Sequence, residues 1–246
     1  MQSNIGDPRT AVVLGARNLG GAVLDHLMAR GWKAAGVARS QETLARVRER
    51  GALALEADAA DPEALAAALA RAREEHGSLD LVVNAVSASR APSGGGPFGG
   101  GPLADASLEA FRGWTAAVAE QSFAFLSSGA VALREAGGGT LVQVTGGSSR
   151  RAMPGRGLWA AGAFATRALV QAAAQELRED GVHVALLVVD ATIESPKTAS
   201  FTTDAPPDSL ASQQEIARAV EFLADQGARG MTHELVLTPA GDRWVP

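Results

Sequence analysis

The sequence predicts an α/β fold: a single-domain, doubly wound parallel sheet with helices on both faces. Short apolar runs alternate with longer segments of helical periodicity along the whole chain. The chain has 246 residues, enough to bury one sizeable core. Its hydrophobic share of 46% and charged share of 20% are those of an ordinary globular domain. We therefore expect residues 1–246 to form one domain.

The first two strand–helix units are read from apolar runs and their ends. TAVVLGA (10–16) predicts a buried strand, and NLGGAVLDHLMARG (18–31) predicts a helix closed by Gly31. WKAAGVA (32–38) predicts a second strand, and a helix over 40–50 follows it.

The third and fourth strands continue the same alternation. ALALEAD (52–58) predicts the third strand, and Asp61-Pro62 marks the start of a helix that runs to about residue 76. LDLVVNAV (79–86) predicts a fourth strand, apolar enough to be covered on both faces. The later elements are helix 107–136, strand 140–146, helix 158–179, strand 182–190, helix 212–226 and strand 233–239.

This alternation predicts right-handed crossovers and a parallel sheet covered on both sides. Open sheets of this kind bind ligands outside the carboxyl ends of their strands. The Gly-rich segment 93–102 follows the fourth strand and segment 191–211 follows the sixth, so we expect both to be loops close to an active site. An inert surface insertion explains the Gly-rich segment equally well.

Several classes of site are excluded or disfavoured by composition. The chain has no cysteine and no tyrosine, so neither a thiolate nor a phenol can act in it. Its four histidines show no metal-ligand spacing, and we expect no metal. The net charge of −5 gives no general attraction to nucleic acid or to an anionic membrane. No secretory signal and no apolar run of about 20 residues is visible, so we expect a cytoplasmic protein with neither partner.

A Gly-rich turn follows the first strand and opens the first helix. In GARNLGG (15–21), Gly15 permits a tight turn, and Gly20 or Gly21 allows close packing of helix and strand. The helix N-terminus then offers N–H groups to a pyrophosphate. Arg17 occupies the middle position of the pattern, and a purely structural turn explains the outer glycines nearly as well.

The residue after the second strand indicates which dinucleotide would bind. Arg39 follows this strand, where the adenosine ribose lies in such folds, and an arginine suits a 2′-phosphate. Arg17 could reach the same group. No acidic residue occurs between Gly31 and Ser40, which favours NADP(H) over NAD(H). Two solvated surface arginines are the alternative.

At these places the chain resembles the short-chain dehydrogenase/reductase family, whose members have a Rossmann-like fold. The likeness covers nearly the whole chain, and its motifs are individually loose but follow one another in the family's order and spacing. They are GARNLGG, Asp58 in EADAADPEAL, Asn84 in LVVNAV, the strand LVQVT, the helix from Trp159, IESP (193–196) and EIARAVEFLAD.

The family's turn usually reads G-x3-G-x-G, and this turn departs from it. Either the loop is one residue short, which makes Gly20 the last glycine and places Asn18 in the middle, or Leu19 replaces the middle glycine. We prefer the shortened loop because it keeps Leu19 on the apolar face of the helix.

The resemblance implies further contacts with the cofactor. Asp58 would bond the adenine amine, Asn84 would support the cofactor near its ribose, and Ile193 and Ser195 would hold the nicotinamide carboxamide. Alternatively, Asp58 caps the following turn and Asn84 only forms hydrogen bonds at the end of its strand.

The resemblance also implies that the catalytic half of the family pattern is missing. The places of the family's Asn, Ser, Tyr and Lys fall on Gln121, Gly146, Trp159 and Ala163. An indole N–H can donate a hydrogen bond but cannot release its proton, so the usual ketone–alcohol mechanism should be absent. Gln121 and Trp159 remain candidate catalytic residues by position.

Asp190 is the main candidate for a replacement catalytic group. It takes the family's Pro-Gly place near the expected nicotinamide pocket, and with Glu194 it makes a candidate acid–base pair. Alternatively, Asp190 caps a turn and Glu194 is solvated. Arginines of the loop 146–157 could bind an anion or polarise an oxygen, although surface arginines are common; they are Arg150, Arg151 and Arg156.

Four aromatic residues could line a pocket for an apolar or aromatic substrate, or could simply pack in the core or at an interface; they are Trp114, Phe123, Phe125 and Trp159. His183 lies at the amino end of the sheet, away from the expected site.

Two classes of function follow. The first is a divergent NADP(H)-dependent oxidoreductase that acts on a small molecule by a mechanism without the tyrosine–lysine pair. The second is a non-redox protein on the same fold: a cofactor-sensing pseudoenzyme, a partner subunit, or an isomerase or cyclase. We favour the first. The resemblance also implies a homo-oligomer, a dimer or tetramer, formed through helices 107–136 and 158–179.

Overall fold

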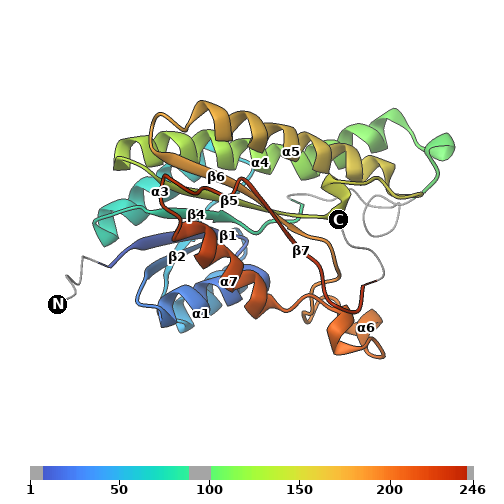
Figure 1. Ribbon diagram of the computed structural model, residues 1–246, viewed down its shortest axis with the longest axis horizontal. Coiled ribbons are helices and arrows are strands. Elements are labelled where there is room, and N and C mark those ends of the chain that lie inside the picture. The colour runs from blue at the N-terminus through green and yellow to red at the C-terminus, as the bar shows by residue number, and fades with distance from the viewer. Residues whose placement is uncertain (1–7, 89–100, 243–246) are drawn as a thin grey trace.

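The computed structural model of the chain describes residues 8–88 and 101–242. It contains one seven-stranded parallel sheet in the order β3-β2-β1-β4-β5-β6-β7, which confirms the predicted fold class (Figure 1). The strands are β1 (Thr10–Leu14), β2 (Lys33–Ala38), β3 (Leu53–Glu56), β4 (Leu81–Asn84), β5 (Gly139–Gly146), β6 (Val182–Val189) and β7 (Glu234–Leu237).

The apolar runs become central strands because both faces of the sheet are covered. All eight residues of β6 are buried, as are all residues of β1 and β4. Strands β3, β4 and β7 are each four residues long, shorter than the predicted 52–58, 79–86 and 233–239, because the apolar runs extend beyond the residues that pair with a neighbouring strand. The strand order reverses between β1 and β4, and this switch point is where open α/β sheets form a crevice at their carboxyl edge.

Two hydrophobic clusters cover the two faces. Helices α1 (Leu19–Ala29), α2 (Gln41–Glu49) and α7 (Gln213–Ala224) contribute to one cluster. Helices α3 (Pro62–His76), α4 (Leu108–Ala136) and α5 (Gly157–Glu176) contribute to the other. Figure 1 shows α4 and α5 on one side of the sheet and α1 and α7 on the opposite side.

The helix ends follow local chemistry. Asp61 caps α3 by accepting from the backbone N–H groups of Glu63 and Ala64, as the Asp61-Pro62 pair predicts. Gly31 has φ of +86° just beyond the end of α1, a conformation that favours glycine.

Among the described residues, α4 alone is long and apolar enough to cross a membrane by length and composition. This helix was predicted at 107–136, and polar and small residues interrupt its apolar ones, so it contains no continuous apolar run of about 20 residues. In the structure, 56% of its most apolar window is buried inside the protein, so packing against α3, α5 and the sheet accounts for its composition. The cytoplasmic location stays a prediction.

The amino ends of β6 and β7 meet at two histidines. His183 is 2% exposed, and its Nε2 lies 3.0 Å from the Thr232 carbonyl oxygen. Its ring stands edge-on to that of His233, with centroids 5.6 Å apart. Arg178 donates to Nε2 of His233 at 3.1 Å, so this nitrogen carries no proton in the pair. Burial lowers the pKa of His183, against the backbone hydrogen bond to Thr232, which raises it.

The lowered pKa of His183 predicts that the protein loses stability in mild acid. Below the unfolded pKa of about 6.5, the unfolded chain binds a proton that the folded chain resists, so the free energy of unfolding should fall by up to about 1.4 kcal/mol per pH unit. Urea unfolding between about pH 7 and pH 5 measures this slope. A His183→Leu variant should show a shallower slope, and identical slopes would contradict the assignment.

Candidate functional site

The Gly-rich turn lies at the carboxyl end of β1, against the chain that leaves β4. Gly15 has φ of +78°, and its N–H donates to the Val37 carbonyl oxygen at 3.1 Å. A Cβ at Gly15 would lie 3.0 Å from backbone atoms of Ala85 and Val86. Both the conformation and the space therefore require glycine at this position.

The second glycine of the turn allows the close approach of helix α1. A Cβ at Gly20 would lie only 2.5 Å from the Gly15 carbonyl oxygen. This oxygen belongs to the backbone of the turn and cannot move away to relieve the clash. Gly21 instead faces the flexible end of Arg50. Helix α1 begins at Leu19, which is 9% exposed and packs into the core, and Asn18 stands at its N-cap without a side-chain capping bond to any described residue. Arg17 continues the turn, its N–H donating to the Gly15 carbonyl oxygen at 2.8 Å.

Arg39 and Asp58 form an ion pair beside this turn. Arg39 follows β2 and Asp58 follows β3, and their Nη1 and Oδ2 atoms are 3.6 Å apart. The Arg39 side chain is 50% exposed, whereas that of Asp58 is 18% exposed. Asp58 also accepts from the Ala60 N–H at 3.0 Å, so it caps the following turn, as the alternative interpretation predicts. The turn that follows β3 therefore fixes the Asp58 carboxylate, and this carboxylate orients Arg39.

Asn84 lies at the end of β4 with its side chain directed into the protein. It is fully buried, and its amide nitrogen donates to side-chain oxygens of Gln121 and Gln143. Its Oδ1 accepts from the Val86 N–H at 3.1 Å. Gln121 is 2% exposed within this amide cluster. The sequence analysis missed Gln143, although a polar residue in the apolar run TLVQVTG was a signal for it.

The segment after β6 brings Ile193 and Ser195 into one turn. Ile193 pairs with Ala211 in an isolated bridge, and its carbonyl oxygen accepts from Thr198 Oγ1 at 2.7 Å. Ser195 Oγ lies 3.0 Å from the same hydroxyl. The predicted loop 191–211 thus contains the short helix α6 (Ala199–Thr202) and is tied down by local hydrogen bonds. The other predicted loop, 93–102, lies outside the described residues except for its last two positions.

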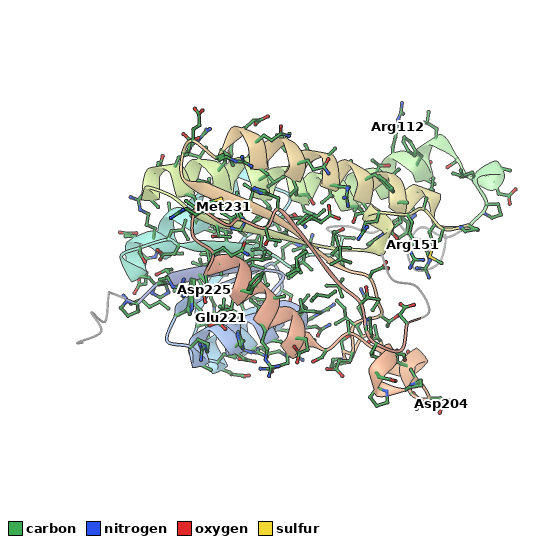
Figure 2. All side chains as sticks on the ribbon, in the orientation of Figure 1. Arg112, Arg151, Asp204, Glu221, Asp225 and Met231 are labelled. Carbon is green, nitrogen blue, oxygen red and sulfur yellow. The ribbon has the colours of Figure 1, made fainter. Side chains whose placement is uncertain are left out.

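Asp190 is buried at the carboxyl end of β6 and pairs with an arginine. Nη2 of Arg151 lies 3.2 and 3.4 Å from the two carboxylate oxygens of Asp190. The Asp190 side chain is 9% exposed and that of Arg151 is 35% exposed (Figure 2 labels Arg151). A Cβ at Gly147 would lie 1.8 Å from Asp190 Oδ1, so the carboxylate fills the space above this glycine. Glu194 is exposed, and the partner of Asp190 is Arg151.

The neighbouring arginines have other surroundings. Glu234 of β7 accepts from Arg167 of α5 and lies 3.8 Å from Arg150, so it anchors the loop after β5 to the edge of the sheet. Arg156 is exposed at the N-cap of α5. Of the three loop arginines named from the sequence, Arg151 alone has a buried carboxylate partner among the described ion pairs.

The four aromatic candidates do not form one pocket. Trp114 and Trp159 meet edge to face with centroids 6.0 Å apart, and Trp114 is 5% exposed. Phe125 is fully buried in the core, and Phe123 is 55% exposed on α4. Of the four aromatic candidates, only Trp114 of α4 and Trp159 of α5 are thus shown in contact with each other.

Two further positions differ in the space around them. A Cβ at Gly146 would meet only the Val189 carbonyl oxygen, at 3.7 Å, among the described atoms within 4 Å. Ala163 is 2% exposed on α5. A side chain could therefore begin at Gly146 without a clash with the described atoms, whereas Ala163 is enclosed by its neighbours.

Comparisons with known proteins place this architecture. A family model described as enoyl-(acyl carrier protein) reductase matches residues 13–241. A comparison with curated proteins gave no match.

Similar solved structures cover nearly the whole chain. A short-chain type dehydrogenase/reductase from Mycobacterium ulcerans is 23% identical with a TM-score of 0.81, over 93% of this chain and 87% of that one. A short-chain dehydrogenase from Rhodopseudomonas palustris is 22% identical with a TM-score of 0.74, over 94% and 98%. A metagenomic short-chain oxidoreductase in complex with NADP is 25% identical with a TM-score of 0.71, over 95% and 98%.

Proposed function

We infer a function from one premise: the chain belongs to the short-chain dehydrogenase/reductase family, whose model matches most of it. We propose that it is an NADP(H)-dependent oxidoreductase that acts on a small molecule without a tyrosine–lysine pair. The observation that carries this proposal is the buried Asp190–Arg151 ion pair at the carboxyl end of β6, on the edge of the sheet that also holds the glycine turn.

The residues at the first switch point fit a phosphorylated dinucleotide. Contacts within the protein require glycine at positions 15 and 20, and the tight turn that results leads directly into helix α1, whose N-terminal N–H groups suit a pyrophosphate. Arg39 is held by Asp58 and half exposed, as a ligand of a 2′-phosphate should be. The NADP in the complex of the metagenomic oxidoreductase supports the same cofactor for this chain.

The Asp190–Arg151 pair could supply the stabilisation that a hydroxyl and a phenol give elsewhere in the family. When bound, the dinucleotide supplies hydride exchange. Negative charge that develops on a substrate oxygen needs a preorganised donor, and a guanidinium donates without titrating. Asp190 holds the Arg151 guanidinium in place, while Arg151 keeps a third of its side chain exposed. The proton that completes the alcohol then comes from water.

Trp159 and Trp114 support a substrate with an apolar or aromatic part. Trp159, at the start of α5, packs edge to face on the buried Trp114 of α4, and this contact fixes the position of its ring. The indole N–H of Trp159 adds a donor that cannot release its proton. Arg151 and Trp159 are therefore the proposed catalytic residues, and Asp190 is the positioning residue that holds Arg151.

The places of the catalytic tetrad support the second candidate function. If the chain is aligned with the family as the motifs indicate, Gly146 and Ala163 offer no polar side chain. A non-redox protein that senses or retains the dinucleotide would keep the glycine turn and lose the proton relay. It would bind the cofactor and show no turnover, whereas the enzyme would show both.

Calorimetry with NADPH, NADP⁺ and NAD⁺ tests the cofactor first. We expect both phosphorylated forms to bind more tightly than NAD⁺, with micromolar dissociation constants. If neither phosphorylated form binds more tightly than about millimolar, the proposed function is wrong. Binding without oxidation of NADPH across a panel of ketones, imines and activated alkenes would favour the non-redox alternative.

We also propose a homo-oligomer that buries the outer faces of α4 and α5. Phe123 and Val131 of α4 and Phe164 of α5 are each more than two-fifths exposed. Sedimentation velocity should show a dimer or tetramer. A Phe123→Glu/Phe164→Glu variant should dissociate, whereas Phe222→Glu, on the equally exposed face of α7, should not. A monomeric wild type would contradict the proposal.

A further inference from the structure

We propose that Gln121, Asn84 and Gln143 form a positioning unit that fixes the backbone against which the dinucleotide-binding turn packs. This inference rests on the proposed function, because it concerns affinity for NADP(H). It assigns Gln121, whose place belongs to a catalytic residue in the resembling family, to cofactor binding rather than to proton transfer. Gln143 gains a role that neither its sequence position nor the family match indicated.

The three side-chain amides form hydrogen bonds with one another and with nearby backbone carbonyl groups in the core. Asn84 Nδ2 donates to Gln143 Oε1 at 2.9 Å and to Gln121 Oε1. Gln121 Nε2 donates to the Val118 carbonyl oxygen at 2.9 Å and to that of Val86 at 3.3 Å. Gln143 Nε2 donates to the Val144 carbonyl oxygen at 2.8 Å. The three residues are 0% to 2% exposed, so water cannot replace a lost partner.

The unit forms hydrogen bonds to the backbone of the segment that follows β4. Asn84 Oδ1 accepts from the Val86 N–H, and Gln121 donates to the Val86 carbonyl oxygen, so both polar backbone atoms of Val86 are bound by it. Buried amides that all have partners form a rigid arrangement, because moving one leaves another unsatisfied. The path of residues 84–86 is thereby fixed from helix α4.

The segment 85–86 is in contact with the Gly-rich turn. The Ala85 N–H donates to the Leu14 carbonyl oxygen at 3.0 Å, and the backbone of Ala85 and Val86 approaches the Cβ position of Gly15 to 3.0 Å. A shift of Val86 would therefore bring its backbone closer to Gly15 or move it away from Gly15. An unbroken chain of contacts runs from Gln121 through Val86 to the turn.

Asn84 acts through this chain of contacts. It has no exposed surface, and its amide is used inside the protein. Its support of a cofactor is thus exerted through the backbone of residues 85 and 86. The same holds for Gln121, whose amide nitrogen and oxygen both have buried partners. Both are positioning residues.

The experiment compares cofactor affinity with thermal stability in the full-length protein. Gln121→Leu and Gln143→Leu remove the amides while keeping similar volume, and Gln121→Asn keeps an amide on a shorter side chain. Ser128→Ala is the matched control, because it removes a hydrogen bond from a buried side chain of α4 to the Pro62 carbonyl oxygen, 2.9 Å long, that shares no atom with the unit. The probe is NADPH, titrated by calorimetry, and thermal unfolding is recorded for each variant.

We expect all four variants to unfold at lower temperature and only the three glutamine variants to bind NADPH about tenfold more weakly. The Gln121→Leu/Gln143→Leu double variant should bind more tightly than the product of the two single losses predicts, because both act on Asn84. If Gln121→Leu does not fold, Gln121→Asn carries the comparison.

A glutamine variant that is less stable but binds NADPH as the wild type does would overturn the inference and leave the proposed function intact. A wild type that does not bind NADPH would overturn both. Weaker binding in Ser128→Ala, matching that of the glutamine variants, would show a general effect of stability and would also overturn the inference.

Discussion

An Arg39→Ala variant should lose about 10- to 150-fold in affinity for NADPH and almost nothing for NADH. A hydrogen bond between charged groups contributes about 1.5–3 kcal/mol, and each 1.4 kcal/mol is a factor of ten in the dissociation constant. Only the 2′-phosphate distinguishes the two cofactors, and Arg39, which pairs with Asp58 at the end of β2, is the cation proposed to bind it. Calorimetric titration of both cofactors measures the difference.

Arg46 provides a matched control for Arg39. It is an arginine of α2 whose side chain is 48% exposed, against 50% for Arg39, and it also pairs with a carboxylate, that of Glu42. Arg46→Ala should leave both affinities within about twofold of the wild type. Equal losses of NADPH and NADH affinity in Arg39→Ala would mean that Arg39 acts on the turn in general and does not recognise a phosphate.

An Asp190→Asn variant should reduce hydride transfer by about 10²- to 10³-fold while binding NADPH nearly as the wild type does. Without the Asp190 charge, Arg151 is no longer held in place as the donor to the developing oxyanion, and the loss of one such donor typically has this effect. Asparagine keeps the shape of aspartate, but it cannot fix the Arg151 guanidinium with a charge. The measurement is the rate of NADPH oxidation with whichever ketone, imine or activated alkene the wild type reduces.

Two further variants make the Asp190 result specific. Gly147→Ala should reduce turnover in the same way, because the added Cβ would lie 1.8 Å from Asp190 Oδ1 and displace the carboxylate. Asp180→Asn removes the carboxylate of an exposed ion pair with Arg134 and should leave turnover unchanged. Turnover that survives in Asp190→Asn would remove the pair from the mechanism.

The order of strands and helices was predictable because it depends on local patterns. Apolar runs of strand length, such as VHVALLVV in β6, are buried on both faces, and helices follow the expected spacing. Gly15 and Gly20 were also recognisable, since a sharp turn and a close helix–strand contact admit no side chain. The lengths of β3, β4 and β7 were overestimated, because pairing with a neighbour is not a property of one segment.

The partners at the site were beyond prediction for a different reason. Asp190 was named as an acid–base candidate with Glu194, four residues away, yet it pairs with Arg151, which is 39 residues away. Gln143 escaped notice because its partner, Asn84, is 59 residues away on the neighbouring strand. The register Asn84↔Gln143 and Gly146↔Val189 decides both contacts.

The sequence by itself determined the α/β alternation and the glycine turn, and it led to the proposal that Arg39 binds a phosphate. Each of these depends on hydrophobic periodicity, backbone conformation or charge within a few residues. Only the tertiary structure decided which buried polar groups satisfy one another. Burial makes an unpaired charge or amide costly, so the fold must supply its partner, and that partner comes from whichever strand or helix the sheet places beside it.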